Sequence, residues 1–290
     1  MQNIIKMCAE AIVTISNQTV KALRILITTV AFALIAGIGV NNADSLTWRT
    51  ATVIASGFVG ATTSSIYELI DTHGQGFKTW FQSKVTHRNR DIYLSFSYLF
   101  RIEIGGKYLL VRGHRMKDRY QPIGGVYKFY QEAKPFLNSI HYQPDTMVGN
   151  TDETDDLRIR IKGKHLLAFM DWFLRMEDRE YGPDREFYEE LIKPGALPEE
   201  AFRHLRYRKV DVHNKGITKS PVPNRIDEVI YADIFEVVLT EEQKQLVLKA
   251  LTEHPNDFCL ASPEEMKSRR YGGSIEMNLG NNVPWLLGEA

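Results

Sequence analysis

The chain begins with two long apolar runs and continues as a densely charged sequence. Residues 25–40 and 50–67 contain no charged side chain, and a short loop, residues 41–49, joins them. Each run is close to the ~17–25 residues that cross a bilayer core. The pattern predicts a transmembrane hairpin within a membrane domain of residues 1–72. The alternative is a buried helical hairpin in the core of a soluble protein.

Basic residues lie before and after this predicted hairpin and are nearly absent from the loop that joins its two runs. The joining loop contains a single basic residue, Arg49. Because basic residues accumulate on the cytoplasmic side of a membrane, both termini and the large domain are expected in the cytoplasm. The flanking basic residues are Lys6, Lys21 and Arg24 before the first run, and Lys78, Lys84, Arg88 and Arg90 after the second.

The second apolar run is rich in small residues. Ser56 and Gly60, and Gly57 and Ala61, form pairs four residues apart. Small residues at this spacing let helices approach closely in lipid. They favour a homo-oligomer, and the alternative is ordinary packing within one hairpin.

A polar connector, residues 73–91, precedes a region in which strand and helix patterns are mixed. Ile92–Ile104 alternates apolar and polar residues, and Gly105 and Gly106 turn it into residues 107–113, which predicts a β-hairpin. Residues 92–290 are therefore expected to form an α/β domain. Further strands are expected within 120–130, 157–161, 204–213, 227–239 and 257–262, and helices within 165–176, 197–205, 241–251 and 263–270. Thr240 with Gln243 has the spacing of a capping box, and Ser262 is a predicted N-cap.

Composition adds little to this picture. Lys and Arg together number 36, as do Asp and Glu, so net charge identifies no partner. The two cysteines, Cys8 and Cys259, predict neither a disulfide framework nor a zinc site.

An acidic pattern in the second half of the chain carries the candidate chemistry. Glu186, Glu189 and Glu190 share one face of a helix because they are three and four residues apart. Three carboxylates on one face repel each other, and a divalent cation such as Mg²⁺ or Mn²⁺ relieves that repulsion. The alternative is an acidic, solvated helix face.

The longer string Glu177-x7-Arg185-Glu186-φ-x-Glu189-Glu190 resembles the Nudix box, G-x5-E-x7-R-E-U-x-E-E-x-G-U. Two box glycines are replaced, by Asp171 and Ile192, although Gly195 is near the second position. Nudix domains also carry a Gly-Gly pair at a strand end, which Gly124 and Gly125 match. About 50 residues lie between this pair and Glu177, so the domain is expected to contain an insertion.

This resemblance implies a Nudix-like α/β/α sandwich with a mixed sheet. It assigns Glu186, Glu189 and Glu190 as metal ligands, with Glu189 and Glu190 in catalysis. It also assigns Arg185 to orient a box carboxylate and Glu177 to support the loop. The missing glycines leave open whether the domain hydrolyses a nucleotide. Phosphate-binding candidates are Arg112, Arg115 and Arg269, and candidates for a later carboxylate ligand are Glu228, Asp233 and Glu236.

Two transmembrane helices joined to such a domain resemble the membrane effectors of bacterial CBASS antiphage systems that carry a SMODS-associated Nudix domain. The resemblance implies an inner-membrane protein whose Nudix-like domain senses a cyclic oligonucleotide and whose helices assemble to disrupt the bilayer. The expected partners are that nucleotide, lipid and further copies of the chain, without double-stranded nucleic acid. The alternatives are a membrane-anchored Nudix hydrolase of nucleoside diphosphate derivatives and a membrane scaffold.

Overall fold

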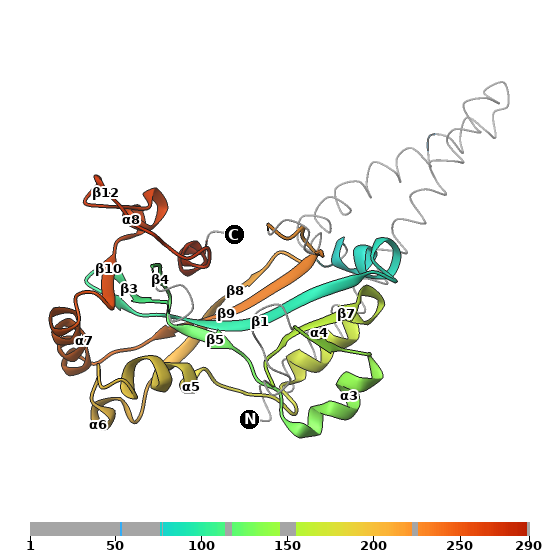
Figure 1. The fold of residues 1–290 in the computed structure, drawn as a ribbon, viewed down its shortest axis with the longest axis horizontal. Coiled ribbons are helices and arrows are strands. Elements are labelled where there is room, and N and C mark those ends of the chain that lie inside the picture. The colour runs from blue at the N-terminus through green and yellow to red at the C-terminus, as the bar shows by residue number, and fades with distance from the viewer. Residues whose placement is uncertain are drawn as a thin grey trace. The chain divides into compact units, whose positions relative to one another are not determined.

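The computed structural model describes residues 53, 76, 78–113, 118–145, 155–221 and 226–288 (Figure 1). By their internal contacts the residues form two compact units. One comprises Met1–Arg88 with Leu166–Arg175, and the other Asn89–His165 with Met176–Ala290.

The first unit contains the π-helical turn η1 (Gln82–Thr86) and helix α4 (Leu166–Arg175). Helix α4 confirms the helix expected within residues 165–176. Its buried side chains include Leu166, Phe169 and Phe173, which recur at helical spacing and give it one apolar face.

The predicted fold class is wrong in its first part, because no helix in the described residues is both long and apolar enough to cross a bilayer. The longest, α7 (Glu241–Glu253), has 13 residues and contains several Glu and Lys side chains, whereas a spanning helix needs about 20 mostly apolar residues. The runs 25–40 and 50–67 lie outside the described residues except for Val53. The fold class that the described residues support is a mixed α/β domain.

The second unit is built on a six-stranded mixed sheet. Strand β1 (Asp91–Arg101) lies at its centre and pairs in parallel with β9 (Glu228–Val237) over nine residue pairs. The other pairings are antiparallel, and the strand order is β6-β7-β1-β9-β8, with β5 also on β1. These strands are β5 (Gly124–Val126), β6 (Gln143–Pro144), β7 (Arg158–Lys162) and β8 (Tyr207–Asn214).

A smaller four-stranded sheet contains the predicted hairpin. Strands β2 (Glu103–Ile104) and β3 (Lys107–Arg112) pair antiparallel across Gly105 and Gly106, whose φ angles of 59° and 77° suit a tight hairpin turn. The hairpin prediction is confirmed. Strands β4 (Tyr120–Gln121) and β10 (Phe258–Ala261) complete this sheet, and β11 (Arg270–Tyr271) pairs separately with β12 (Ile275–Glu276).

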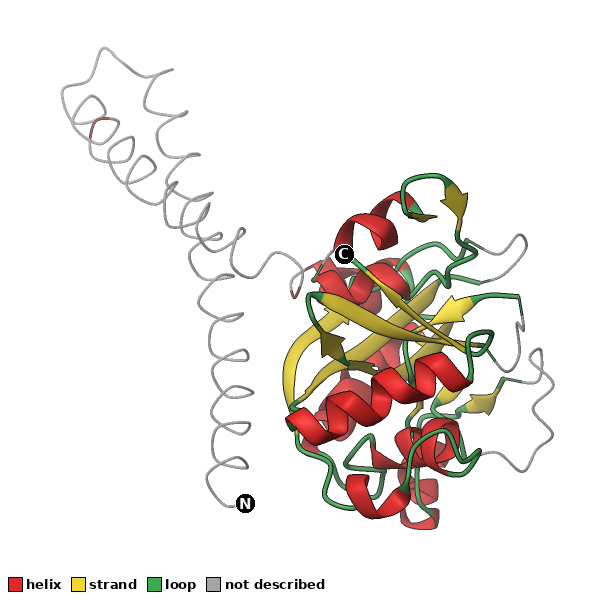
Figure 2. Ribbon diagram, turned by 90° about the vertical axis from the view of Figure 1, so that its left-hand side faces the viewer, coloured by secondary structure: helices red, strands yellow, loops and turns green. Residues whose placement is uncertain are grey.

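Helical segments cover both faces of the large sheet, as adjacent positions of β1 show (Figure 2). The ring of Phe100 meets Phe187 of the helix α5 (Asp184–Phe187), whereas Leu99 joins a core cluster with Val283 and Leu286 of the turn η5 (Val283–Leu287). Neighbouring strand residues point to opposite faces, so the sheet lies between two layers, as the Nudix-like sandwich requires.

The remaining helices are short, and their caps agree with the sequence. Thr240 and Ser262 each form a full capping box, at the start of α7 and of α8 (Pro263–Ser268), which confirms both predictions. The others are η2 (Gln131–Ala133), α3 (Lys134–Ser139), η3 (Gly163–His165), η4 (Tyr188–Ile192) and α6 (Glu199–Phe202).

Candidate functional site

The three box glutamates line a single cleft. Helix α5 continues without a break into the π-helical turn η4, so Glu186, Glu189 and Glu190 stay on neighbouring turns. They line a cleft of about 440 Å³ together with Lys193 and Pro194. Phe187 and Leu191, on the opposite face of these turns, are buried in the core, so the face with the three glutamates points toward the cleft.

The strand-end glycines lie directly against these carboxylates. A methyl group on Gly125 would overlap the carboxylate of Glu186. The backbone N–H of Gly124 donates to Glu190 Oε2 at 3.3 Å, and a methyl group there would overlap the backbone of β1 at Tyr98. With a φ of 152°, Gly124 also has a conformation that residues with side chains rarely adopt. The sequence therefore needs glycine at both positions for the helix to approach the strand end this closely.

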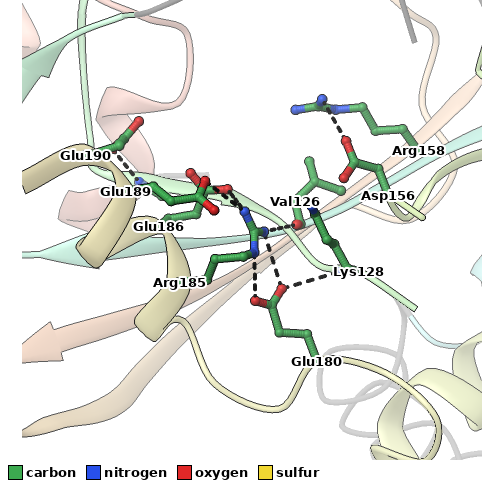
Figure 3. A network of polar contacts seen from close by, with 10 residues as sticks. Val126, Lys128, Asp156, Arg158, Glu180, Arg185, Glu186, Glu189 and Glu190 are labelled. Carbon is green, nitrogen blue, oxygen red and sulfur yellow. Dashed lines mark hydrogen bonds and ion pairs between the residues drawn. The ribbon is translucent and has the colours of Figure 1, made fainter. Parts of the chain in front are cut away.

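Arg185 lies at the centre of the polar network, but its carboxylate partner from the preceding loop is Glu180. Its Nε donates to Glu180 Oε1 at 3.0 Å and its Nη1 to Glu186 Oε1 at 2.5 Å. Nη1 also reaches Glu189 Oε2 at 3.4 Å, and Nη2 donates to the backbone oxygen of Val126 at 3.0 Å. Figure 3 shows the guanidinium between Glu180 on one side and Glu186 and Glu189 on the other.

Sequence reasoning assigned the supporting role to Glu177 and missed Glu180. Glu177 is exposed and pairs with no other described residue. Glu180 is instead held by the backbone N–H of Lys128 at 3.3 Å, which aims its carboxylate at Arg185. The signal available was a second glutamate in the same loop, but the motif spacing favoured Glu177.

Glu190 is the carboxylate in the cleft without a cationic partner among the described residues. Burial raises its pKa to about 8, with further contributions from the negative charges of Glu186 and Glu189 and an opposing one from the Gly124 N–H. Burial also raises the pKa of Glu186, against the opposing effect of Arg185. The three carboxyl groups are therefore crowded around one guanidinium, and without a cation Glu190 favours its protonated form.

A divalent cation fits this donor set at Glu190 and Glu186. Within the described part of the chain no three acidic, His or Cys side chains converge on one metal position, and Arg185 already engages Glu186 and Glu189. Mg²⁺, however, is commonly held by one or two carboxylates together with waters and substrate phosphates. The uncompensated Glu190 supplies the charge that such an ion would neutralise.

The other predicted site residues lie elsewhere. Arg112 is at the end of β3, Arg269 donates to the backbone oxygen of Leu279, and neither lines the cleft. Arg115, and the predicted membrane packing residues Ser56, Gly57, Gly60 and Ala61, are outside the described residues.

The later carboxylates also lie away from the cleft. Glu236 pairs with Arg101 and Arg208, and Glu228 is buried at the start of β9. Asp233 is buried and accepts hydrogen bonds from two tyrosines.

The two replaced box glycines have structural consequences at each end of the motif. Asp171 lies inside α4. The loop before the box helix (α5 and η4, residues 184–192) therefore begins only after Arg175, later than the first motif position. Ile192 ends η4 at the position of the second box glycine, and Gly195 follows three residues later in the turn with a φ of 83°.

Comparisons with known proteins identify the family. A search of curated proteins and a search of solved structures each found no match. A family model described as the SMODS-associated NUDIX domain matches residues 91–287, which is most of the chain and includes β1, the strand-end glycines and the box helix. Nudix domains commonly use divalent metals, in agreement with the acidic cleft. The chain therefore belongs to the SMODS-associated NUDIX domain family.

Proposed function

We propose that this chain is a CBASS-type antiphage effector whose Nudix-like domain binds a cyclic oligonucleotide through a divalent cation in the Glu186–Glu190 cleft. The family membership supports the effector context. The observation that carries the binding proposal is Glu190, a carboxyl with a pKa raised to about 8 and no ion-pair partner among the described residues. A phosphodiester anion is repelled by such a cleft unless a cation lies between them, and Mg²⁺ bridges carboxylates and phosphates in this way.

Two aromatic residues in and just before the box helix are exposed and offer surfaces for the bases. Tyr181, in the loop before the box helix, is 65% exposed, and Tyr188, between Phe187 and Glu189, is 47% exposed. Large exposed rings are costly to leave in water, and each presents a face on which a nucleotide base can stack. Stacking tolerates any base, so these residues support a nucleotide ligand without specifying its sequence.

The second candidate function is metal-dependent hydrolysis of a nucleoside diphosphate derivative. It is favoured by the same Glu190 carboxyl, because a group with a pKa near 8 is partly ionised near neutral pH and in that form accepts a proton from water. A bound cation would lower the pKa of water and neutralise charge on the phosphates. The chain's contribution would be the proton acceptor and the positioning of the phosphates beside Lys193.

The test is calorimetric titration of the purified full-length chain with cyclic di- and trinucleotides, with and without Mg²⁺ or Mn²⁺. Binding should need the cation, and Glu190→Gln should weaken it at least about tenfold. Glu177→Gln is the matched control, because Glu177 is an exposed glutamate just outside the network. Absence of binding to any cyclic nucleotide, together with turnover of linear nucleoside diphosphate derivatives, would favour the hydrolase.

The predicted inner-membrane location, lipid partner and homo-oligomer stay predictions. They rest on residues 25–67, of which only Val53 lies within the described part of the chain. The membrane hairpin forms no part of the proposed nucleotide binding.

A further inference from the structure

A single extended segment, residues 124–128, contacts three box residues, Arg185, Glu186 and Glu190, and also Glu180. The contacts come from its backbone and are spread over four residues. The Gly124 N–H donates to Glu190, Gly125 faces the carboxylate of Glu186, the Val126 oxygen accepts from Arg185, and the Lys128 N–H donates to Glu180. Figure 3 shows Val126 and Lys128 beside Arg185 and Glu180. The geometry of the carboxylates therefore depends on where this segment lies.

The remaining residue of the segment, Tyr127, points into the protein and is tied to β9. Its hydroxyl donates to Asp233 Oδ2 at 2.7 Å, and both side chains are almost fully buried. Asp233, 4% exposed, also accepts from the Tyr231 hydroxyl at 2.9 Å and pairs with Lys209 at 2.5 Å. A buried carboxylate needs several partners of this kind to offset the loss of water.

The same buried group acts on the loop that carries Glu180. Arg179 is 2% exposed, and its guanidinium lies over the ring of Tyr127 at 4.7 Å from the centroid. Burial lowers the pKa of Arg179, and Tyr127 and Asp233 oppose this shift by favouring the charged guanidinium. Arg179 Nη1 donates to the backbone oxygen of Glu180 at 2.5 Å, so the buried side chain is attached to the residue that pairs with Arg185.

Backbone pairing joins the segment to this loop. The Tyr130 N–H donates to the Asp178 oxygen and the Glu180 N–H to the Lys128 oxygen, each at 2.8 Å. Residues 124–130 and 178–180 are therefore hydrogen-bonded to each other. Asp233 accepts a hydrogen bond from Tyr127 of the first segment, and Arg179 of the second segment lies over the Tyr127 ring.

We infer that Asp233 and Tyr127 are positioning residues, which hold segment 124–128 and the loop 178–180 at the distance that gives the Glu186–Glu190 cleft its affinity for a divalent cation. The inference rests on the cation of the proposed function. Neither residue lines the cleft, so both act through the backbone that the box contacts.

Tyr127→Phe is the sharpest variant because it deletes one oxygen atom. The ring keeps its edge-to-face contact with Tyr98, at 4.8 Å between centroids, and its place beneath Arg179. Asp233 keeps its bonds to Tyr231 and Lys209. The fold is therefore expected to survive while the link between β9 and the segment is lost.

The experiment is a titration of the full-length chain with Mn²⁺, followed by the electron paramagnetic resonance signal of free Mn²⁺. Tyr127→Phe should bind Mn²⁺ about five- to tenfold more weakly, equivalent to the loss of one buried hydrogen bond. Tyr120→Phe is the matched control, because its hydroxyl donates to a backbone oxygen, that of Asn256, in the region of the smaller sheet. Amide hydrogen exchange at Gly124 and Lys128, measured without metal, should be faster in Tyr127→Phe than in this control.

A role limited to stability would lower the melting temperature and leave the affinity, measured well below melting, unchanged. Wild-type affinity in Tyr127→Phe therefore overturns the inference while the proposed cation site stands. If the wild-type chain itself binds no Mn²⁺, the proposed cation site is overturned, and the positioning role with it.

Discussion

At the scale of single residues, Glu190 determines how the stability of this domain depends on pH. Its pKa is about 8 in the folded protein and near the usual 4.5 when unfolded. Between these values the folded state binds more protons than the unfolded state, so stability falls as pH rises. Glu190→Gln removes this titration. The variant should gain about 1–3 kcal/mol relative to the wild type between pH ~5 and pH ~8, since each pKa unit corresponds to about 1.4 kcal/mol and the carboxyl keeps partial access to water.

Urea unfolding of both proteins near pH 5 and near pH 8, in the presence of a chelator, measures this difference. The exposed Glu177→Gln variant is the control for removing a glutamate charge from the same region. A Glu190→Gln variant that is less stable than the wild type near pH 8 would contradict the assignment of an uncompensated carboxyl.

At the scale of elements, the junction between the loop 176–183 and the box helix depends on one ion pair. Arg185 and Glu180 are both largely buried, and they make two contacts, at 3.0 and 3.4 Å. A double-mutant cycle of Glu180→Gln with Arg185→Gln should give a coupling energy of about 1–2 kcal/mol. The same cycle with Glu177→Gln should give about zero, because Glu177 is exposed and the ion pairs of Arg185 are with Glu180, Glu186 and Glu189.

Thermal or urea unfolding of the two single and one double variant for each pair provides the cycle. Coupling of Arg185 to Glu177 and none to Glu180 would refute the arrangement in Figure 3.

At the scale of the whole domain, the C-terminal turn η5 closes one face of the large sheet. Trp285 stacks on His213 of β8 with the ring centroids 4.0 Å apart and the planes 11° apart. Burial, and then the positive charge of Lys215, lower the pKa of His213, against the opposing effect of Asp211. The unfolded state therefore binds a proton more readily, and stability is lost as the pH falls below the usual histidine value of about 6.5.

His213→Phe keeps a flat ring for Trp285 but cannot be protonated. It should remove the loss of melting temperature between about pH 7 and pH 5, and His204→Gln, an exposed histidine, should not. Because Glu190 changes stability in the opposite direction over the same pH range, the comparison is made in the Glu190→Gln background. An unchanged pH profile in His213→Phe would show that the stacked pair does not sense pH.

Also at this scale, local sequence patterns determined many of the elements. Alternation over Ile92–Ile104 corresponds to β1 and β2, the two glycines that follow form the hairpin turn, and Thr240 and Ser262 begin their helices. Residues three and four apart bring Glu186, Glu189 and Glu190 to one cleft. Each of these features depends on residues close together in the sequence. Residue types and their spacing are therefore enough to predict it. The apolar runs predicted a membrane hairpin as part of the fold class, and no helix among the described residues could cross a bilayer.

Only the tertiary structure decided which side chains meet across the sheet. Asp233 and Tyr127 are 106 residues apart, and their contact exists because β1 carries β5 on one edge and β9 on the other. Glu180 replaces Glu177 beside Arg185 because the backbone of Lys128 and the buried Arg179 hold the loop in one register. The charge on Glu190 is uncompensated because Arg185 reaches Glu180, Glu186 and Glu189 instead. Motif spacing specifies distance along the chain, whereas ion pairs and pKa values depend on distance in space and on burial.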